Sequence, residues 1–163
     1  MKLQLRYPLD CPAATFWALY FDPAFTTRLH LEALGSLRAE VVDQSGDLAT
    51  GLRRTLRYAQ RPDAPGPVKK LFGDEIVSTE VSTYDPATGT SSFTLTPGTM
   101  ADKTDIRGTI HVDDLGGTCE ERFELEAKVR IFGAGPVVER FIERQARDVQ
   151  DKAVAFMRQE LAG

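Results

Sequence analysis

Residues 136–161 read PVVERFIERQARDVQDKAVAFMRQEL, and this stretch decides the fold. Charged residues alternate in it with apolar residues that recur at the spacing of one helical face. The apolar residues are Val138, Phe141, Ile142, Val149, Ala153, Phe156 and Met157. The pattern predicts one amphipathic helix from Pro136 to Leu161, about 39 Å long at 1.5 Å per residue.

The chain before this helix consists mainly of segments typical of β-strands. Lys2 to Leu9 alternates apolar and polar side chains, as a half-buried strand does. Six further strands are expected over residues 37–43, 48–60, 74–84, 92–96, 104–113 and 118–131. In the last of them the apolar side chains point one way and the charged ones the other, which is typical of an antiparallel sheet with one wet face.

Two short helices are predicted between the first and second strands. Pro12 suits a first helical position, where its missing N–H is not needed, so one helix is expected from Pro12 to about Tyr20. Asp22 and Pro23 repeat this start signal, and Gly35 ends the second helix. A long helix that follows antiparallel strands needs a curved sheet to lie in, and this arrangement often leaves a cavity between helix and sheet.

The turn at residues 113–117 (DDLGG) gives one cross-strand register. A turn centred between Leu115 and Gly116 places Gly108 opposite Phe123. An aromatic ring across from a strand glycine covers exposed backbone, which supports this register.

Arg54 and Glu80 are the charged side chains expected on the concave side of the sheet. A connection symmetric about Pro67 places them opposite each other, where they form either a site for a ligand's carboxylate or hydroxyl, or a structural ion pair. A slip of one residue turns Glu80 outward. In that alternative phase the inward side chains are Val77, Val81, Phe93 and Leu95.

Composition and charge are those of an ordinary globular protein, with 42% hydrophobic and 27% charged residues. A length of 163 residues predicts one domain, residues 1–163. The net charge of −4, with both signs interspersed, argues against a nucleic-acid partner. No segment approaches the roughly 20 apolar residues of a transmembrane span. The N-terminus lacks the apolar run of a signal peptide, so a cytoplasmic location is expected.

The reactive side chains form no catalytic or metal motif. Cys11 and Cys119 are expected as buried free thiols, although pairing of the first and last strands would also allow a disulfide. His30 and His111 are too few and too far apart for a zinc site, and both are expected at the surface. The glycines before Pro136 lack the spacing of a phosphate-binding loop. No catalytic residue, metal or cofactor is therefore predicted.

The segment Pro67–Phe72 (PVKKLF) combines two cations with three apolar side chains. One interpretation is a lid that touches an anionic membrane surface transiently, to which each lysine contributes about 1 kcal/mol. The other, which we favour, is an ordinary loop with Leu71 and Phe72 tucked onto the sheet.

The order of strand, two short helices, six strands and one long helix resembles the helix-grip fold of the START and birch-pollen-allergen superfamily, SRPBCC. The resemblance is closest to a bacterial branch without an assigned activity, and rests on residues 22–25 (DPAF), 73–75 (GDE) and 131–136 (IFGAGP). It implies an α+β fold in which a seven-stranded curved antiparallel sheet wraps around the C-terminal helix. It also implies an internal pocket for lipids, polyketides, sterols or other apolar ligands, without a universal catalytic set.

The expected function is therefore binding or transport of a small hydrophobic or amphipathic ligand, such as a lipid, in an internal cavity. Fold and strand phase together give the expected lining, which is Leu52, Arg54, Leu56, Tyr58, Glu80, Phe93, Ile106, Ile110, Phe123, Leu125, Phe141, Ile142 and Val149. Small residues at Ala127, Ala146 and Ala153 would leave room for the ligand.

Two alternatives stay open. One is an enzyme like a polyketide cyclase or aromatase, with Glu80 or Tyr58 transferring protons. The other is a protein-interaction module that uses the charged outer face of the sheet.

Overall fold

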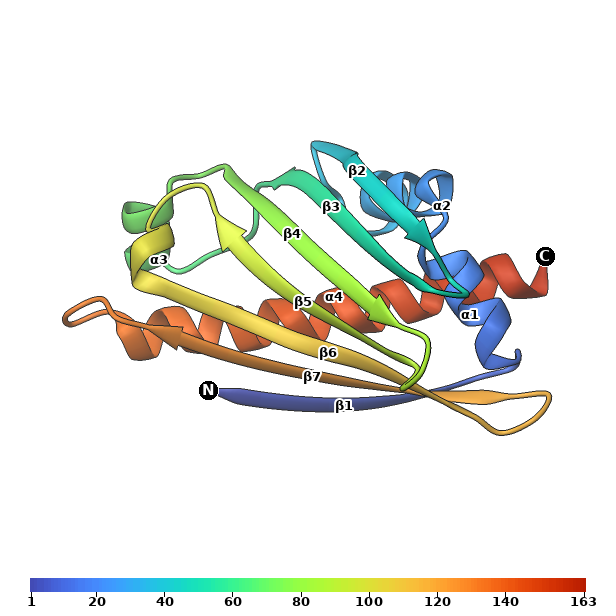
Figure 1. Ribbon diagram of the computed structural model, residues 1–163. Coiled ribbons are helices and arrows are strands. Elements are labelled where there is room, and N and C mark those ends of the chain that lie inside the picture. Colours follow the sequence, from blue (N-terminus) through green and yellow to red (C-terminus); the bar gives the residue numbers. More distant parts are fainter.

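The computed structural model describes residues 1–163, and its central layer is a seven-stranded antiparallel sheet. The strands lie in the order β1 (Lys2–Leu9), β7 (Cys119–Val129), β6 (Thr104–Asp114), β5 (Thr90–Pro97), β4 (Ile76–Asp85), β3 (Gly51–Gln60) and β2 (Arg38–Asp47). The first strand pairs with the last, so β1 and β2 form the two edges (Figure 1).

The sheet curves around one long helix, α4 (Gly135–Ala162), whose 28 residues span about 42 Å. At its C-terminal end lie α1 (Ala13–Tyr20), α2 (Pro23–Arg28) and the π-helical turn η1 (Leu29–Ala33), as Figure 1 shows. At its N-terminal end lies α3 (Gly66–Phe72), and a 3₁₀ turn, η2 (Ala101–Lys103), leads into β6. The predicted α+β helix-grip fold is confirmed.

Local chemistry explains how the helical segments begin and end. The Asp22 carboxylate caps α2 by accepting a hydrogen bond from the Ala24 amide at 3.2 Å. In η1 the Leu34 amide donates to the carbonyl of Leu29, five residues earlier, which widens the helical turn. Gly35 then ends the segment with a φ of +69°, a conformation that glycine adopts without strain.

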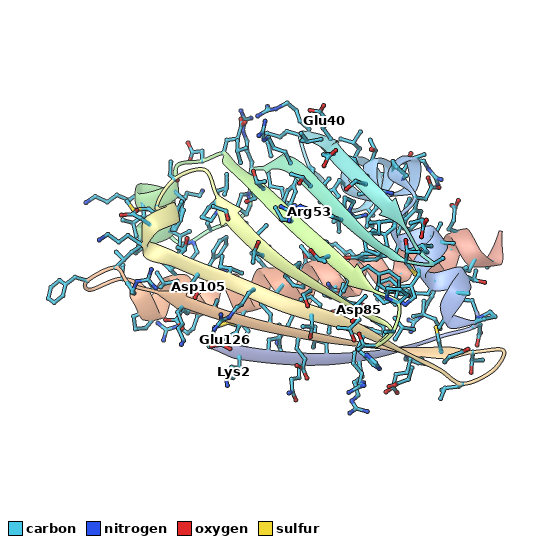
Figure 2. The ribbon with its side chains drawn as sticks, viewed as in Figure 1. Lys2, Glu40, Arg53, Asp85, Asp105 and Glu126 are labelled. Carbon is cyan, nitrogen blue, oxygen red and sulfur yellow. The ribbon has the colours of Figure 1, made fainter.

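The core lies between the concave face of the sheet and α4. From the helix it contains Val138, Phe141 and Met157, as the apolar spacing predicts, and also Val154, which the prediction did not include. At the C-terminal end of α4 the core becomes aromatic, and the rings that contact one another there are Phe16, Trp17, Tyr20, Phe21 and Tyr84. The other face of the sheet is polar, and Figure 2 shows Arg53 and Glu126 on the side turned away from α4.

The hairpin between β2 and β3 differs from the expected boundaries. Strand β2 continues to Asp47, with a bulge between Val41 and Asp43, and β3 begins at Gly51 instead of residue 48. The Asp47 carboxylate accepts hydrogen bonds from the amides of Ala49 and Thr50 at 3.0 and 2.8 Å. This Asx-type bonding places the turn at residues 47–50.

The predicted register of the β6–β7 hairpin is wrong by two residues. The pair Asp114 and Cys119 leaves four residues in the turn, so Gly108 lies opposite Leu125 and not Phe123. The ring that covers Gly108 comes from the other neighbouring strand, where Phe93 of β5 is its partner. A Cβ at residue 108 would lie 2.5 Å from Phe93 Cζ, so only glycine fits there.

The connection between β3 and β4 contains a helix where a loop was expected. In α3 the side chains of Val68 and Phe72 are buried and pack against Val138 and Phe141 of α4. The two lysines between them are exposed. The apolar residues that a membrane contact would need therefore belong to the core. None of the helices combines the length and the apolar character that crossing a bilayer requires.

The two cysteines are buried free thiols, as predicted. Cys11 follows β1 closely and Cys119 begins β7, where it pairs with Leu9. Burial raises the pKa of both thiols, that of Cys119 to about 12.

Candidate ligand-binding site

A cavity of about 190 Å³ lies between the concave face of the sheet and α4, and we call it the outer chamber. Fifteen of its 23 lining residues are hydrophobic, so its walls offer mainly dispersion contacts. Its volume exceeds the roughly 150 Å³ at which an apolar cavity in a protein stays dry and binds benzene.

The walls of the outer chamber follow from two periodicities. Alternate residues of β6 and β7 point inward, which brings Ile106, Ile110, Phe123 and Leu125 to one wall. Successive turns of α4 supply the opposite wall, which consists of Val138, Phe141, Ile142, Gln145, Ala146, Val149 and Gln150. Ala146 is the smallest side chain of this wall and leaves space in its centre.

A second cavity of about 110 Å³, the inner chamber, adjoins the outer one beside α1, α2 and η1. The residues that line both chambers, and therefore lie at their junction, are Tyr20, Tyr58, Glu80, Val149 and Gln150. The inner chamber also contains His30, Arg54 and Glu121, which are all buried. Eleven of the 17 lining residues of the inner chamber are hydrophobic, so it is mainly apolar like the outer chamber but also contains buried ionisable groups.

A surface groove gives the outer chamber access to solvent. Residues that line both are Gln60, Pro62, Gln145 and Val149. The outer part of this groove, which we call the portal, has both charges, from Arg61, Asp63, Arg144, Asp148 and Lys152. A ligand would enter between residues 60–65 and α4.

Arg54 lies on the concave face as predicted, with 3% of its side chain exposed. Its Nη1 donates to the carbonyl oxygen of Tyr20 at 2.8 Å and to Thr26 Oγ1 at 3.0 Å. Its guanidinium carbon lies 4.9 Å from the centre of the Phe21 ring, a cation–π distance. These bonds tie β3 to the end of α1 and to α2.

The expected pair of Arg54 and Glu80 forms, but diagonally. Arg54 pairs across the strands with Ser82, and Glu80 pairs with Leu56. A shift of two residues keeps both side chains on the same face, with 4.0 Å between Arg54 Nη2 and Glu80 Oε1. The alternative phase of β4, with Val77 and Val81 pointing inward, is wrong, whereas Phe93 and Leu95 of β5 do line the outer chamber.

Glu80 lies between the two chambers, beside two phenols. Its Oε1 accepts a hydrogen bond from Ser82 Oγ at 3.1 Å. Burial raises the pKa of both Tyr20 and Tyr58, and the Glu80 carboxylate raises it further. Both phenols therefore stay protonated at neutral pH and can donate hydrogen bonds to a ligand.

His30 is buried, so its predicted surface position is wrong. His30 follows the buried Thr26 of α2 by four residues, about one helical turn, and so lies on the same inward face. Its Nδ1 lies 3.1 Å from Ser36 Oγ, and its ring centre lies 4.6 Å from that of Tyr58. Burial, followed by the positive charge of Arg54, lowers the pKa of His30 to about 4, so the ring is neutral at pH 7. The other histidine, His111, lies outside both chambers and contacts Thr90 and Asp113.

Glu121 is the main polar residue of the site that the sequence patterns did not single out. It is 3% exposed, and burial raises its pKa to about 7. The positive charge of Arg158 lowers this pKa by less than burial raises it. The position of Glu121 in phase with the inward-facing Phe123 and Leu125 is the signal that could have found it.

Most of the expected lining residues meet at the outer chamber. They are Tyr58, Glu80, Phe93, Ile106, Ile110, Phe123, Leu125, Phe141, Ile142 and Val149. Arg54 and Leu56 line the inner chamber instead. Leu52 lines neither, because it is buried in the core opposite Tyr84. Of the small residues, Ala146 and Ala153 line the outer and inner chambers, and Ala127 is packed in the core.

Residues 3–161 match the family model described as a protein of unknown function, DUF2505. The chain belongs to the DUF2505 family. No curated protein sequence matches this DUF2505 chain.

Solved structures place the DUF2505 chain in a known fold. The protein TTHA0849 from Thermus thermophilus is similar at a TM-score of 0.70 and 13% identity, covering 98% of this chain and 95% of that one. The Zhui aromatase/cyclase from a Streptomyces species is similar at a TM-score of 0.67 and 12% identity, covering 98% of this chain and 94% of that one. A START superfamily protein from Mycobacterium smegmatis is similar at a TM-score of 0.62 and 12% identity, covering 98% of this chain and 95% of that one. The DUF2505 chain therefore has the START/SRPBCC fold, and at these identities the likeness establishes the fold alone.

Proposed function

We propose that this DUF2505 protein binds a small hydrophobic or amphipathic molecule, such as a lipid, in the outer chamber and shields it from water. The observation that supports the proposal is the apolar cavity of about 190 Å³ beneath the portal. A helix and sheet that only had to pack could fill this space with larger side chains, for example at Ala146.

The likeness to START/SRPBCC structures supports the same proposal, because proteins of this fold typically hold hydrophobic ligands in the corresponding cavity. An eight-carbon chain transferred into the outer chamber would gain about 6 kcal/mol at about 0.8 kcal/mol per methylene. The loss of translational and rotational freedom removes part of this gain. We expect a dissociation constant between about 10 µM and 1 mM for a simple eight-carbon alcohol.

The test is isothermal titration calorimetry with 1-octanol. In the variant Ala146→Phe the new ring would occupy the centre of the outer chamber, so we expect octanol binding to be lost. Ala155 lies on the exposed side of the same helix, and Ala155→Phe is the matched control that should bind as the wild type does. Equal binding by all three proteins, or none by the wild type, would overturn the proposal.

A second candidate is an enzyme of the cyclase or aromatase type, because the Zhui aromatase/cyclase has this fold and the inner chamber contains buried ionisable groups. A carboxyl group with a pKa near neutrality, as burial gives Glu121, suits general acid–base catalysis. Glu80 and Tyr58 are the other candidates for proton transfer. Loss of turnover in Glu80→Gln with octanol binding intact would favour this candidate.

The third expectation, a protein-interaction module, has less support from the outer face of the sheet. Its exposed side chains include Glu124 and Lys128, and Glu and Lys are depleted in protein interfaces.

A further inference from the structure

The inner chamber contains one buried acidic group that forms no ion pair. The Glu121 carboxyl lines this chamber and is 3% exposed. Arg158, whose charge acts on Glu121, donates its own hydrogen bond to the Pro8 carbonyl oxygen at 2.7 Å. A buried carboxylate normally has an ion-pair or hydrogen-bond partner, because desolvation otherwise penalises its charge strongly.

Glu121 is held rigidly in this position. Its strand, β7, lies inside the sheet, where Glu121 is paired with Tyr7 of β1 on one side and Val112 of β6 on the other. The opposite wall of the inner chamber includes Val154 and Met157 of α4. An apolar side chain would suit such neighbours, so the carboxyl group has no packing explanation.

The other charges of the inner chamber balance one another. Arg54 is paired with Glu80, and its Nη1 is engaged by Tyr20 and Thr26. His30 is neutral at pH 7, because burial and the charge of Arg54 lower its pKa to about 4. An ionised Glu121 therefore leaves the chamber with one negative charge, which a ligand with one positive charge would neutralise.

We propose that the inner chamber takes the protonated amine of an amphipathic amine, with Glu121 as its counter-ion and the apolar part of the ligand in the outer chamber. An alkylammonium group supplies one positive charge and three donors. Glu80, between the chambers, offers a further carboxylate oxygen as acceptor. This inference rests on the proposed function, because it assigns the polar end of the same ligand.

The pH dependence of amine binding follows from the groups around Glu121. These are Tyr7 of β1, Tyr20 of α1, His30 of η1, Arg54 of β3, Glu80 of β4, Cys119 of β7 and Arg158 of α4. Burial raises the pKa of both tyrosines and of Cys119, and lowers that of His30 to about 4. Glu121, with its pKa raised by burial to about 7, passes from neutral to ionised between pH 5.5 and 8.5.

The experiment is calorimetric titration with 1-octylamine, 1-octanol and octanoate at pH 5.5 and 8.5. Octylamine stays protonated at both values, since alkylamines titrate near pH 10. At pH 8.5 we expect it to bind at least about tenfold more tightly than octanol, because a charge-assisted bond replaces an unpaired carboxylate. Octanoate should bind most weakly. At pH 5.5 the ionised fraction of Glu121 falls to about 3%, so octylamine affinity should fall about thirtyfold while octanol affinity stays constant.

The variant Glu121→Gln should lose both the preference for octylamine over octanol and the pH dependence of octylamine binding. Glu124 lies on the opposite face of the same strand, so Glu124→Gln is the matched control and should keep both.

Octanol binding by the wild type without a preference for octylamine would overturn this inference and leave the proposed function standing. An amine preference that persists in Glu121→Gln would also overturn it. Failure of all three probes to bind would overturn the proposed function and the inference together. The wild-type ranking of probes and its pH dependence decide the matter even if the glutamine variant does not fold.

Discussion

Replacing Glu121 by glutamine should make the protein more stable at alkaline pH. Glutamine has the shape of a protonated glutamic acid but cannot ionise. Burial raises the pKa of Glu121 from its ordinary value of 4.5 to about 7 in the folded protein. Between these two values the unfolded chain releases this proton and the folded chain retains it, so wild-type stability falls as pH rises.

The magnitude follows from the size of this shift. At about 1.36 kcal/mol per pKa unit, the wild type should lose roughly 3 kcal/mol from this group between about pH 4.5 and 7, and nothing more above that range. Glu121→Gln should therefore match the wild type near pH 4.5 and exceed its free energy of unfolding by up to about 3 kcal/mol at pH 8.

The assay is urea unfolding followed by circular dichroism at half-unit steps from pH 4.5 to 8.5, with the difference between the two proteins plotted against pH. Contributions from distant groups cancel in this difference. Glu124→Gln, on the exposed face, should give a flat line close to zero. A flat line for Glu121→Gln as well would refute the conclusion that this carboxyl is buried without a partner.

Two further predictions concern the framework of the site. Gly108→Ala should destabilise the fold by about 1–3 kcal/mol in urea unfolding, because its Cβ would lie 2.2 Å from the Glu124 carbonyl oxygen. The control is Gly117→Ala, whose Cβ would meet nothing within 4 Å and which should leave the stability unchanged. Burial lowers the pKa of His30 from 6.5 to about 4, so the wild type should lose roughly 3 kcal/mol of its free energy of unfolding as pH falls from 6.5 to 4. The variant His30→Asn has no such group and should not show this loss. Identical acid titrations of both proteins would contradict a buried His30.

Sequence patterns predicted the elements whose signals are local. The spacing of apolar residues located α4 within a residue at each end, and Asp22 with Pro23 located the start of α2. Alternation along β3 and β7 predicted which side chains face α4, whereas it left two phases open for β4. These signals are reliable because each depends on residues that are neighbours in the chain.

Features that depend on wider geometry were missed. Three prolines made residues 61–73 look like a loop, yet Pro67 lies in the first turn of α3, where a proline costs no hydrogen bond. His30 was expected at the surface, but tertiary packing buries the helical face that it shares with Thr26. The lengths of the connections shifted the β6–β7 and β3–β4 registers by two residues each. This misplaced the partner of Gly108, but each side chain stayed on the predicted face of the sheet.

The chambers themselves could not be predicted from periodicity. A helical face shows which side chains point toward the sheet, but the gap between them depends on sheet curvature and on summed side-chain volumes. The raised pKa of Glu121 is likewise a product of burial by distant elements, namely α1, α2 and the C-terminal half of α4.

Occupation of the space between the sheet and α4 by an apolar ligand is tested most directly by intermolecular nuclear Overhauser effects. In a sample with methyl-labelled protein and 1-octanol, we predict contacts from the alkyl protons to the methyl groups of Ile106, Ile142 and Val149. Contacts confined to exposed methyl groups, such as those of Leu31 and Leu115, would contradict binding in the outer chamber.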